Sequence, residues 1–161
     1  MRSSIGVRIA ALMLIVGGVI GIGIGIYMGY QFLQQHWIYL VLAAAFLVVF
    51  VWSVITGIRL WKNDDRGWKW SKILFAAQIP IVTLPGCSYE YFTGAAFKVV
   101  SGNHEENFKL SLGATITAYL DTRITDVVLG VNIIAVVVLF YLLWQSRSNK
   151  PLKPAANAAA E

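Results

Sequence analysis

The sequence contains few charged residues, and they are unevenly distributed. Asp, Glu, Lys and Arg make up 13% of the 161 residues, about half of the roughly 25% found in a typical soluble domain. The fifty residues between Arg8 and Arg59 include no charged side chain. Because charged side chains cover much of the surface of a water-soluble protein, this stretch excludes a soluble globular fold. The hydrophobic content of 58% also excludes a disordered chain.

Cysteine and histidine are scarce as well. The single cysteine, Cys87, excludes an internal disulfide and a Cys-x-x-Cys redox motif. A metal site built from Cys87, His36 and His104 is chemically conceivable, but these residues lack the short-range spacing of metal-binding motifs. The sequence shows no serine–base arrangement, phosphate-binding loop or paired intramembrane carboxylates. It therefore predicts no enzyme, no bound metal and no other cofactor.

Long apolar segments dominate the sequence instead. A helix needs about 20 apolar residues to cross a bilayer core of about 30 Å, so the charge-free stretch is long enough for two spans. A polar cluster of three glutamines and His36, within residues 31–36, separates them. This places the first span at 9–30 and the second at 37–58.

Two further apolar segments predict a third and a fourth span, at 70–92 and 126–145. The third span contains Pro80 and Pro85. Because proline lacks the N–H that a helical hydrogen bond requires, we expect this helix to be kinked at both prolines.

Three positions within these spans are candidates for a function: Gln78, Pro80 and Asn132. Pro80 deprives the carbonyl of Ala76 of its helical partner, and a free carbonyl in hydrocarbon needs another one. Broken helices hold substrates in transporters, so a small transporter or channel component is one interpretation. The other is a kinked structural helix, in which the Asn132 amide bonds to Gln78 across a helix interface.

The basic residues predict the orientation. Ten of the thirteen Lys and Arg residues lie before the first span, between the second and third, or after the fourth. Cytoplasmic segments are enriched in Lys and Arg, so we expect both termini inside, the segment 93–125 outside, and a bacterial inner membrane. The net charge of +5 is then explained by basic residues that set the orientation and contact anionic lipid headgroups. The sequence contains no basic stripe of the kind that indicates a nucleic-acid partner. Residues 147–161 are expected to form a disordered cytoplasmic tail.

A stripe of glycines runs along the first predicted span. Gly17, Gly21, Gly25 and Gly29 recur every four residues, which places them on one face of a helix. Such a glycine zipper allows another helix to approach closely. We expect it to pack against the other spans of the same chain, with a homo-oligomer or a partner membrane protein as alternatives.

The outer segment contains an alternating pattern. From Phe108 to Thr117, apolar and polar residues alternate, which is typical of a half-buried strand. Residues 95–100 are a second candidate strand, and polar loop residues separate the two. The pattern predicts a β-hairpin over about 96–117.

These features together predict an all-α transmembrane fold. Residues 1–146 would form a single membrane domain, a four-helix membrane bundle with both termini inside and a small β-hairpin in the outer loop between helices 3 and 4. The expected function is that of a multi-pass accessory, assembly or complex-subunit protein. It would act through helix–helix and outer-face contacts within the lipid bilayer, without catalysing a reaction.

Overall fold

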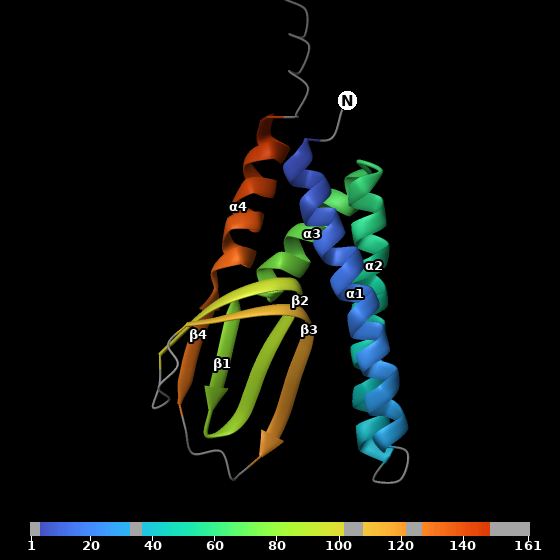
Figure 1. Ribbon diagram of the computed structural model, residues 1–161, viewed down its shortest axis with the longest axis vertical. Helices are drawn as coiled ribbons and strands as arrows, with labels where there is room; N and C mark the ends of the chain where they lie inside the picture. The colour runs from blue at the N-terminus through green and yellow to red at the C-terminus, as the bar shows by residue number, and fades with distance from the viewer. Residues whose placement is uncertain (1–3, 33–36, 102–107, 122–126, 149–161) are drawn as a thin grey trace, which may run out of the picture.

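The computed structural model describes residues 4–32, 37–101, 108–121 and 127–148. Within these ranges the chain forms four helices and a four-stranded antiparallel sheet (Figure 1). The helices are α1 (Ile5–Phe32), α2 (Trp37–Trp61), α3 (Asp65–Ala77) and α4 (Ile133–Ser148). The strands are β1 (Pro80–Leu84), β2 (Gly86–Ser101), β3 (Phe108–Asp121) and β4 (Val128–Asn132). The fold therefore mixes helix and sheet, and the prediction of an all-α four-helix membrane bundle is wrong.

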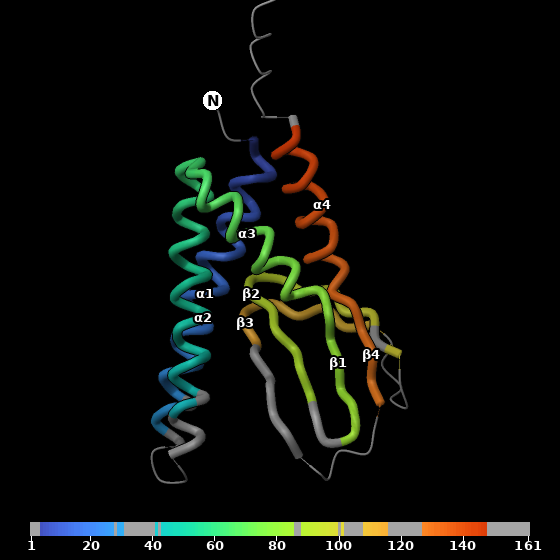
Figure 2. The backbone as a smooth tube through the Cα atoms, turned by 180° about the vertical axis from the view of Figure 1, so that it is seen from behind, coloured from blue at the N-terminus to red at the C-terminus, as the bar shows by residue number. Residues whose placement is uncertain are grey.

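Helices α1 and α2 are long and apolar enough to cross a membrane, and no other helix in the described part of the chain is. They pack side by side as an antiparallel hairpin (Figures 1 and 2). The segments predicted as spans one and two lie inside them. Only 39% of the apolar window Ile5–Tyr27 and 33% of the window Ala43–Trp61 is buried within the protein. The rest of each window is half-buried or exposed.

The third predicted span, at 70–92, is not one kinked helix. Helix α3 ends at Ala77, where Gln78 caps it. Pro80 then begins β1, and Pro85 lies in the turn between β1 and β2. Proline cannot continue the helical hydrogen-bond ladder, and the β-branched residues that follow it favour an extended chain.

The fourth predicted span, at 126–145, is part strand and part helix. Its first portion forms β4, and α4 begins only at Ile133. Strand β4 lies between β1 and β2, so hydrogen bonds on both sides favour the extended conformation there. Helix α4 has 16 residues, about 24 Å, which is shorter than a bilayer core of about 30 Å.

The hairpin predicted at about 96–117 belongs to a longer hairpin in a larger sheet. β2 pairs with β3 from Gly86, opposite Asp121, to Val99, opposite Phe108; residues 102–107 lie outside the described residues. β2 also pairs with β1 near its start and with β4 at its end, and β1 pairs with β4. Strands β1, β4 and β2 therefore close into a ring, and β3 lies along the other edge of β2.

A bend shared by β2 and β3 allows this closure. Gly94 and Gly113 are directly paired, with φ of +90° and +124°, a region that favours glycine. Figure 1 shows the two strands turning together. As a result, the first half of β2 pairs with β1 and the second half pairs with β4.

The core lies where the α1–α2 hairpin meets this bend. Gly17 of α1 contacts the backbone of Thr93 and Gly94, and the ring centroids of Phe50 and Tyr91 are 6.3 Å apart. Helices and sheet share one cluster of buried side chains, which consists of Val7, Ala10, Ala11, Leu14, Phe50, Leu60, Leu74, Phe75, Tyr91, Ala114, Ala135 and Leu142. The sheet is therefore packed against the helices and is not a separate domain.

Candidate functional site

The first part of β3 exposes large apolar side chains. Phe108, Leu110 and Leu112 are 66%, 65% and 79% exposed. They alternate with Lys109 and Ser111, which lie on the opposite face of the strand. This is the alternation that predicted a half-buried strand, but its apolar side chains are exposed.

The same face continues across the sheet, because directly paired residues have their side chains on the same side. Phe108 is paired with Val99, and Val99 with Val131. Leu129 is paired with Val82. We call this surface the apolar sheet face; it consists of Val82, Phe97, Val99, Phe108, Leu110, Leu112, Leu129 and Val131.

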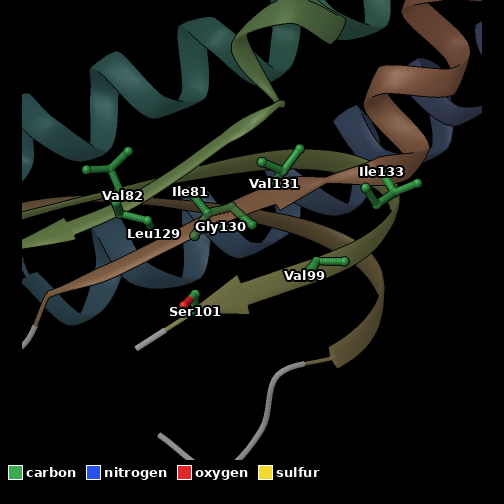
Figure 3. Close-up of a pocket in the computed structure, with 8 residues that line it drawn as sticks. All are labelled: Ile81, Val82, Val99, Ser101, Leu129, Gly130, Val131 and Ile133. Carbon is green, nitrogen blue, oxygen red and sulfur yellow. The ribbon is translucent and has the colours of Figure 1, made fainter. Parts of the chain in front are cut away.

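A hollow of about 420 Å³ lies between the strands that carry the apolar sheet face (Figure 3). Among the lining residues, Ser101 has the one polar side chain. The others are Ile81, Val82, Val99, Leu129, Gly130, Val131 and Ile133. With one hydroxyl and no ionisable group, the hollow suits an apolar occupant better than a polar substrate.

The opposite face of β2 carries the charges of this region. Glu90 and Lys98 lie on either side of the bend and form a salt bridge. The Lys98 Nζ atom is 4.6 Å from the ring centroid of Phe92, and Lys98 is buried. The sheet therefore has one face without charge and one face with an ion pair between the buried Lys98 and the half-buried Glu90.

Helix α4 extends the apolar surface beyond the sheet. Ile133, Val137, Phe140 and Trp144 are 39%, 61%, 67% and 64% exposed. Their spacing of three or four residues places them along one side of the helix. Ile133 also lines the hollow, so the α4 stripe and the apolar sheet face are continuous.

The amide of Gln78 is buried and engaged within the protein. Its Nε2 donates to Thr93 Oγ1 (2.9 Å), and its Oε1 accepts from the Thr93 N–H (3.2 Å). Both side chains are buried. Sequence analysis missed Thr93, because it lay in a segment interpreted as an outer loop. Pro80, two residues after Gln78, begins β1 and has no place in a broken helix.

Asn132 lies at the junction between β4 and α4. Its Oδ1 accepts from the N–H of Ala135 (3.4 Å), and its own N–H donates to the carbonyl of Ile79 (2.9 Å). Its Nδ2 is buried without a hydrogen-bond partner in the described part of the chain. Asn132 thus caps α4 and ties it to the end of α3. The predicted bond to the Gln78 side chain is not among the hydrogen bonds of the described residues.

Tyr91 of β2 adds a hydroxyl to the polar groups in the core between the sheet and helices α1 and α2. This hydroxyl is buried and has no hydrogen-bond partner among the described residues. A phenol is neutral at physiological pH. It contributes a dipole, and no charge, to this part of the core.

The glycine stripe contacts two different elements. A Cβ on Gly17 would overlap the backbone of Gly94 in β2, and one on Gly21 would overlap the ring of Phe50 in α2. A Cβ on Gly25 would lie 2.9 Å from Cδ2 of Leu47, and one on Gly29 would lie 3.9 Å from Cβ of Ala43. The stripe thus packs inside the protein, closely at its first half and loosely at its second.

The three metal-ligand candidates are not brought together in the described structure. His36 and His104 lie outside the described residues. Cys87 lies in β2, where it pairs with Leu84 and Leu120. The part of the chain that the structure describes holds no group of three or more His, Cys, Asp or Glu residues that could bind a metal ion.

Helix α1 begins, and helices α2 and α4 end, at the same end of the molecule (Figures 1 and 2). The helix segments at this end and the link between α2 and α3 are rich in basic residues. These basic residues are Arg8, Arg59, Lys62, Arg66, Lys69, Lys72 and Arg147. The Arg8 guanidinium lies 5.6 Å from the ring centroid of Trp61, and Lys69 Nζ lies 5.6 Å from that of Trp70. This basic end also carries two acids, Asp64 and Asp65.

Comparisons with protein-family models, curated proteins and solved structures gave no match for this chain. The function is therefore inferred from the geometry above. Its most distinctive features are the outward-facing apolar helices, the apolar sheet face and the basic end.

Proposed function

We propose that this is a small integral membrane protein whose α1–α2 hairpin crosses the bilayer. The observation that carries the proposal is the exposure of the two helices. A core helix of a soluble protein is mostly buried, whereas about three fifths or more of each apolar window here is half-buried or exposed. Exposed apolar surface on this scale needs lipid or a partner to cover it.

The basic end supports an orientation with both termini in the cytoplasm, at the inner membrane of a bacterium. Arg8 and Arg59 flank the hairpin at that end, and Arg147 ends α4 there. Each basic residue near an anionic leaflet is worth about 1 kcal/mol. The far end of the hairpin, near Tyr30, would then lie on the outer side.

Within the membrane the protein would act by contact, as an accessory, assembly or complex-subunit protein. The support is the area of apolar surface on α1, α2, α4 and the sheet that the protein itself leaves uncovered. A substrate site at Gln78 and Pro80 gains no such support, because the Gln78 amide is bonded to Thr93 and Pro80 begins a strand.

The orientation is tested by cysteine labelling in intact bacterial cells. In a Cys87→Ser background, Tyr30→Cys should react with a membrane-impermeant maleimide, and Lys62→Cys should react only after permeabilisation. Labelling of both positions in intact cells, or release of the protein from membranes by alkaline carbonate, would contradict the membrane proposal.

The contact role is tested by extracting the full chain in mild detergent and measuring its native mass. A photo-crosslinking residue at Val48, which is 67% exposed on α2, should give a specific protein adduct in cells. A monomeric mass together with no adduct from Val48 or from Val137 on α4 would overturn the accessory role while leaving the membrane location intact.

A further inference from the structure

We infer that the apolar sheet face lies against the acyl chains of membrane lipid, so that the sheet is part of the lipid-facing surface. The inference rests on the proposed membrane location of α1 and α2. It names lipid hydrocarbon as the partner of a surface that would otherwise be expected to face water or protein.

The apolar sheet face is composed mainly of hydrocarbon side chains. Eight apolar side chains lie on four strands, and Ser101 has the one polar side chain among the residues that line the hollow. The hydroxyl of Tyr89, which is paired with Val82, donates to the carbonyl of Ala77 within the protein. A protein–protein interface usually has a polar rim and about one hydrogen bond per 100–200 Å². A surface that offers so few hydrogen-bonding side chains matches hydrocarbon better than a folded partner.

The apolar sheet face is continuous with other apolar surfaces. Through Ile133 it joins the exposed stripe of α4. Strand β3, which carries part of the face, reaches α1 at the bend: a Cβ on Gly113 would lie 3.9 Å from Cγ2 of Ile20, and Ile20 is itself 41% exposed. The strand that carries Phe108, Leu110 and Leu112 therefore lies next to a helix that we place in the bilayer.

Most of the sheet backbone is paired. Unpaired N–H and C=O groups are excluded from hydrocarbon, because each costs several kcal/mol. β1 and β4 have a strand on both edges. β2 is paired with β3 along one edge, and on the other edge with β1 at residues 87–90 and with β4 at residues 98–101. β3 has one partner strand among the described residues, and Lys109 and Ser111 on its other face place it at the boundary with water.

The charges of this region lie away from the apolar sheet face. Lys98 and Glu90 pair on the inner face of the bend, and Lys98 is buried. The ion pair is thus withdrawn from the apolar sheet face. A charged side chain on that face would have to be desolvated by lipid, and the described strands carry none there.

The test compares two adjacent residues of one strand. In a Cys87→Ser background, a nitroxide spin label is attached to Leu110→Cys or to Lys109→Cys, and the full chain is reconstituted in vesicles of phosphatidylethanolamine and phosphatidylglycerol. Collision rates with oxygen, which concentrates in lipid, and with a water-soluble nickel chelate are then measured. A third label at Val19→Cys, on an exposed position of α1, reports on the helix hairpin.

The inference predicts that the ratio of oxygen to nickel accessibility is several-fold higher at position 110 than at position 109, and close to that at position 19. A lipid-like ratio at 19 with water-like ratios at both 110 and 109 would overturn the inference and leave the proposed function standing. Low accessibility of position 110 to both reagents would also overturn it, because a protein partner would then cover the face. A water-like ratio at position 19 would overturn the proposed function itself.

Discussion

The two halves of α1 contain the same glycine repeat but use it differently. From Ile5 to Gly21 the helix is held between α2 and the bend of the sheet, and Gly17 and Gly21 leave no room for a methyl group. From Ile22 to Phe32 the contacts loosen by degrees: a Cβ on Gly25 would lie 2.9 Å from the end of the Leu47 side chain, one on Gly29 would be in ordinary contact, and one on Gly23 would meet nothing within 4 Å.

This difference shows that a small-xxx-small repeat identifies a helix face but not its neighbour. Helix–helix packing is the usual reason for such a stripe, and α2 does occupy it at Gly21 and Gly25. At Gly17, however, the neighbour is the backbone of a β-strand. The closest contact of the stripe is therefore between a helix and a sheet.

The largest expected effect is that of Gly17→Ala. The new methyl group would overlap the main chain of Thr93 and Gly94, which cannot rotate away as a side chain can. Alanine gains about 1 kcal/mol in helix propensity, but we expect overpacking to lower the free energy of unfolding by about 3 kcal/mol or more. Unfolding by SDS in mixed micelles measures it. A loss no larger than that of Gly23→Ala, where space is open, would contradict this contact.

Gly21→Ala should have the next largest effect. Its methyl group would overlap the ring of Phe50, which is 1% exposed and so has little room to move. We expect a loss toward the upper end of about 1–3 kcal/mol. The double variant Gly21→Ala/Phe50→Leu should lose less than the sum of the two single variants. Strict additivity in the same titration would show that the two residues are not in contact.

A smaller effect is expected from breaking the bond that holds β2 at the α1 contact. Gln78→Leu leaves the buried N–H and hydroxyl of Thr93 without their partner, which should cost about 1–3 kcal/mol. Thr93→Val should cost a similar amount. Both variants remove the same side-chain interaction. The double variant should therefore lower the free energy of unfolding by clearly less than the sum of the two single losses. Additive losses would contradict the interaction between Gln78 and Thr93.

The smallest effects are expected at Gly29, the last glycine of the stripe, and at Gly23, which lies outside the stripe. A methyl group at Gly29 would be in ordinary contact, and one at Gly23 would meet nothing within 4 Å. Improved helix propensity, worth up to about 1 kcal/mol, should therefore leave stability unchanged or raised. The same SDS titration measures both. A marked destabilisation by Gly29→Ala would mean that a second chain occupies the loose half of the stripe in the membrane.

The two long helices could be predicted from the sequence, because a charge-free apolar stretch of fifty residues fits two membrane-spanning helices and does not fit the surface of a soluble fold. The strands at 80–84 and 128–132 were not predicted, because short apolar runs fit either helix or strand. Their conformation depends on pairing with each other and with β2, which are separated from them in the sequence.

The candidate site was predictable only in part. Gln78 and Asn132 stand out as amides in apolar segments, but their contacts depend on strands that were not predicted. The alternation after Phe108 indicated two unlike faces of a strand. It could not show that the apolar face is the one left uncovered, because that depends on where α1 and α4 lie relative to the sheet.

The ring formed by β1, β4 and β2 has a consequence for how the chain is made. Strand β4 is the last of the four to be synthesised, yet it lies between two strands that precede it. A growing chain that has reached only Asp121 has one open edge on β1 and another on the second half of β2. Open edges invite pairing with other chains. Completion of the sheet must therefore wait until the residues just before α4 leave the ribosome, and truncation before Val128 should yield an aggregation-prone product.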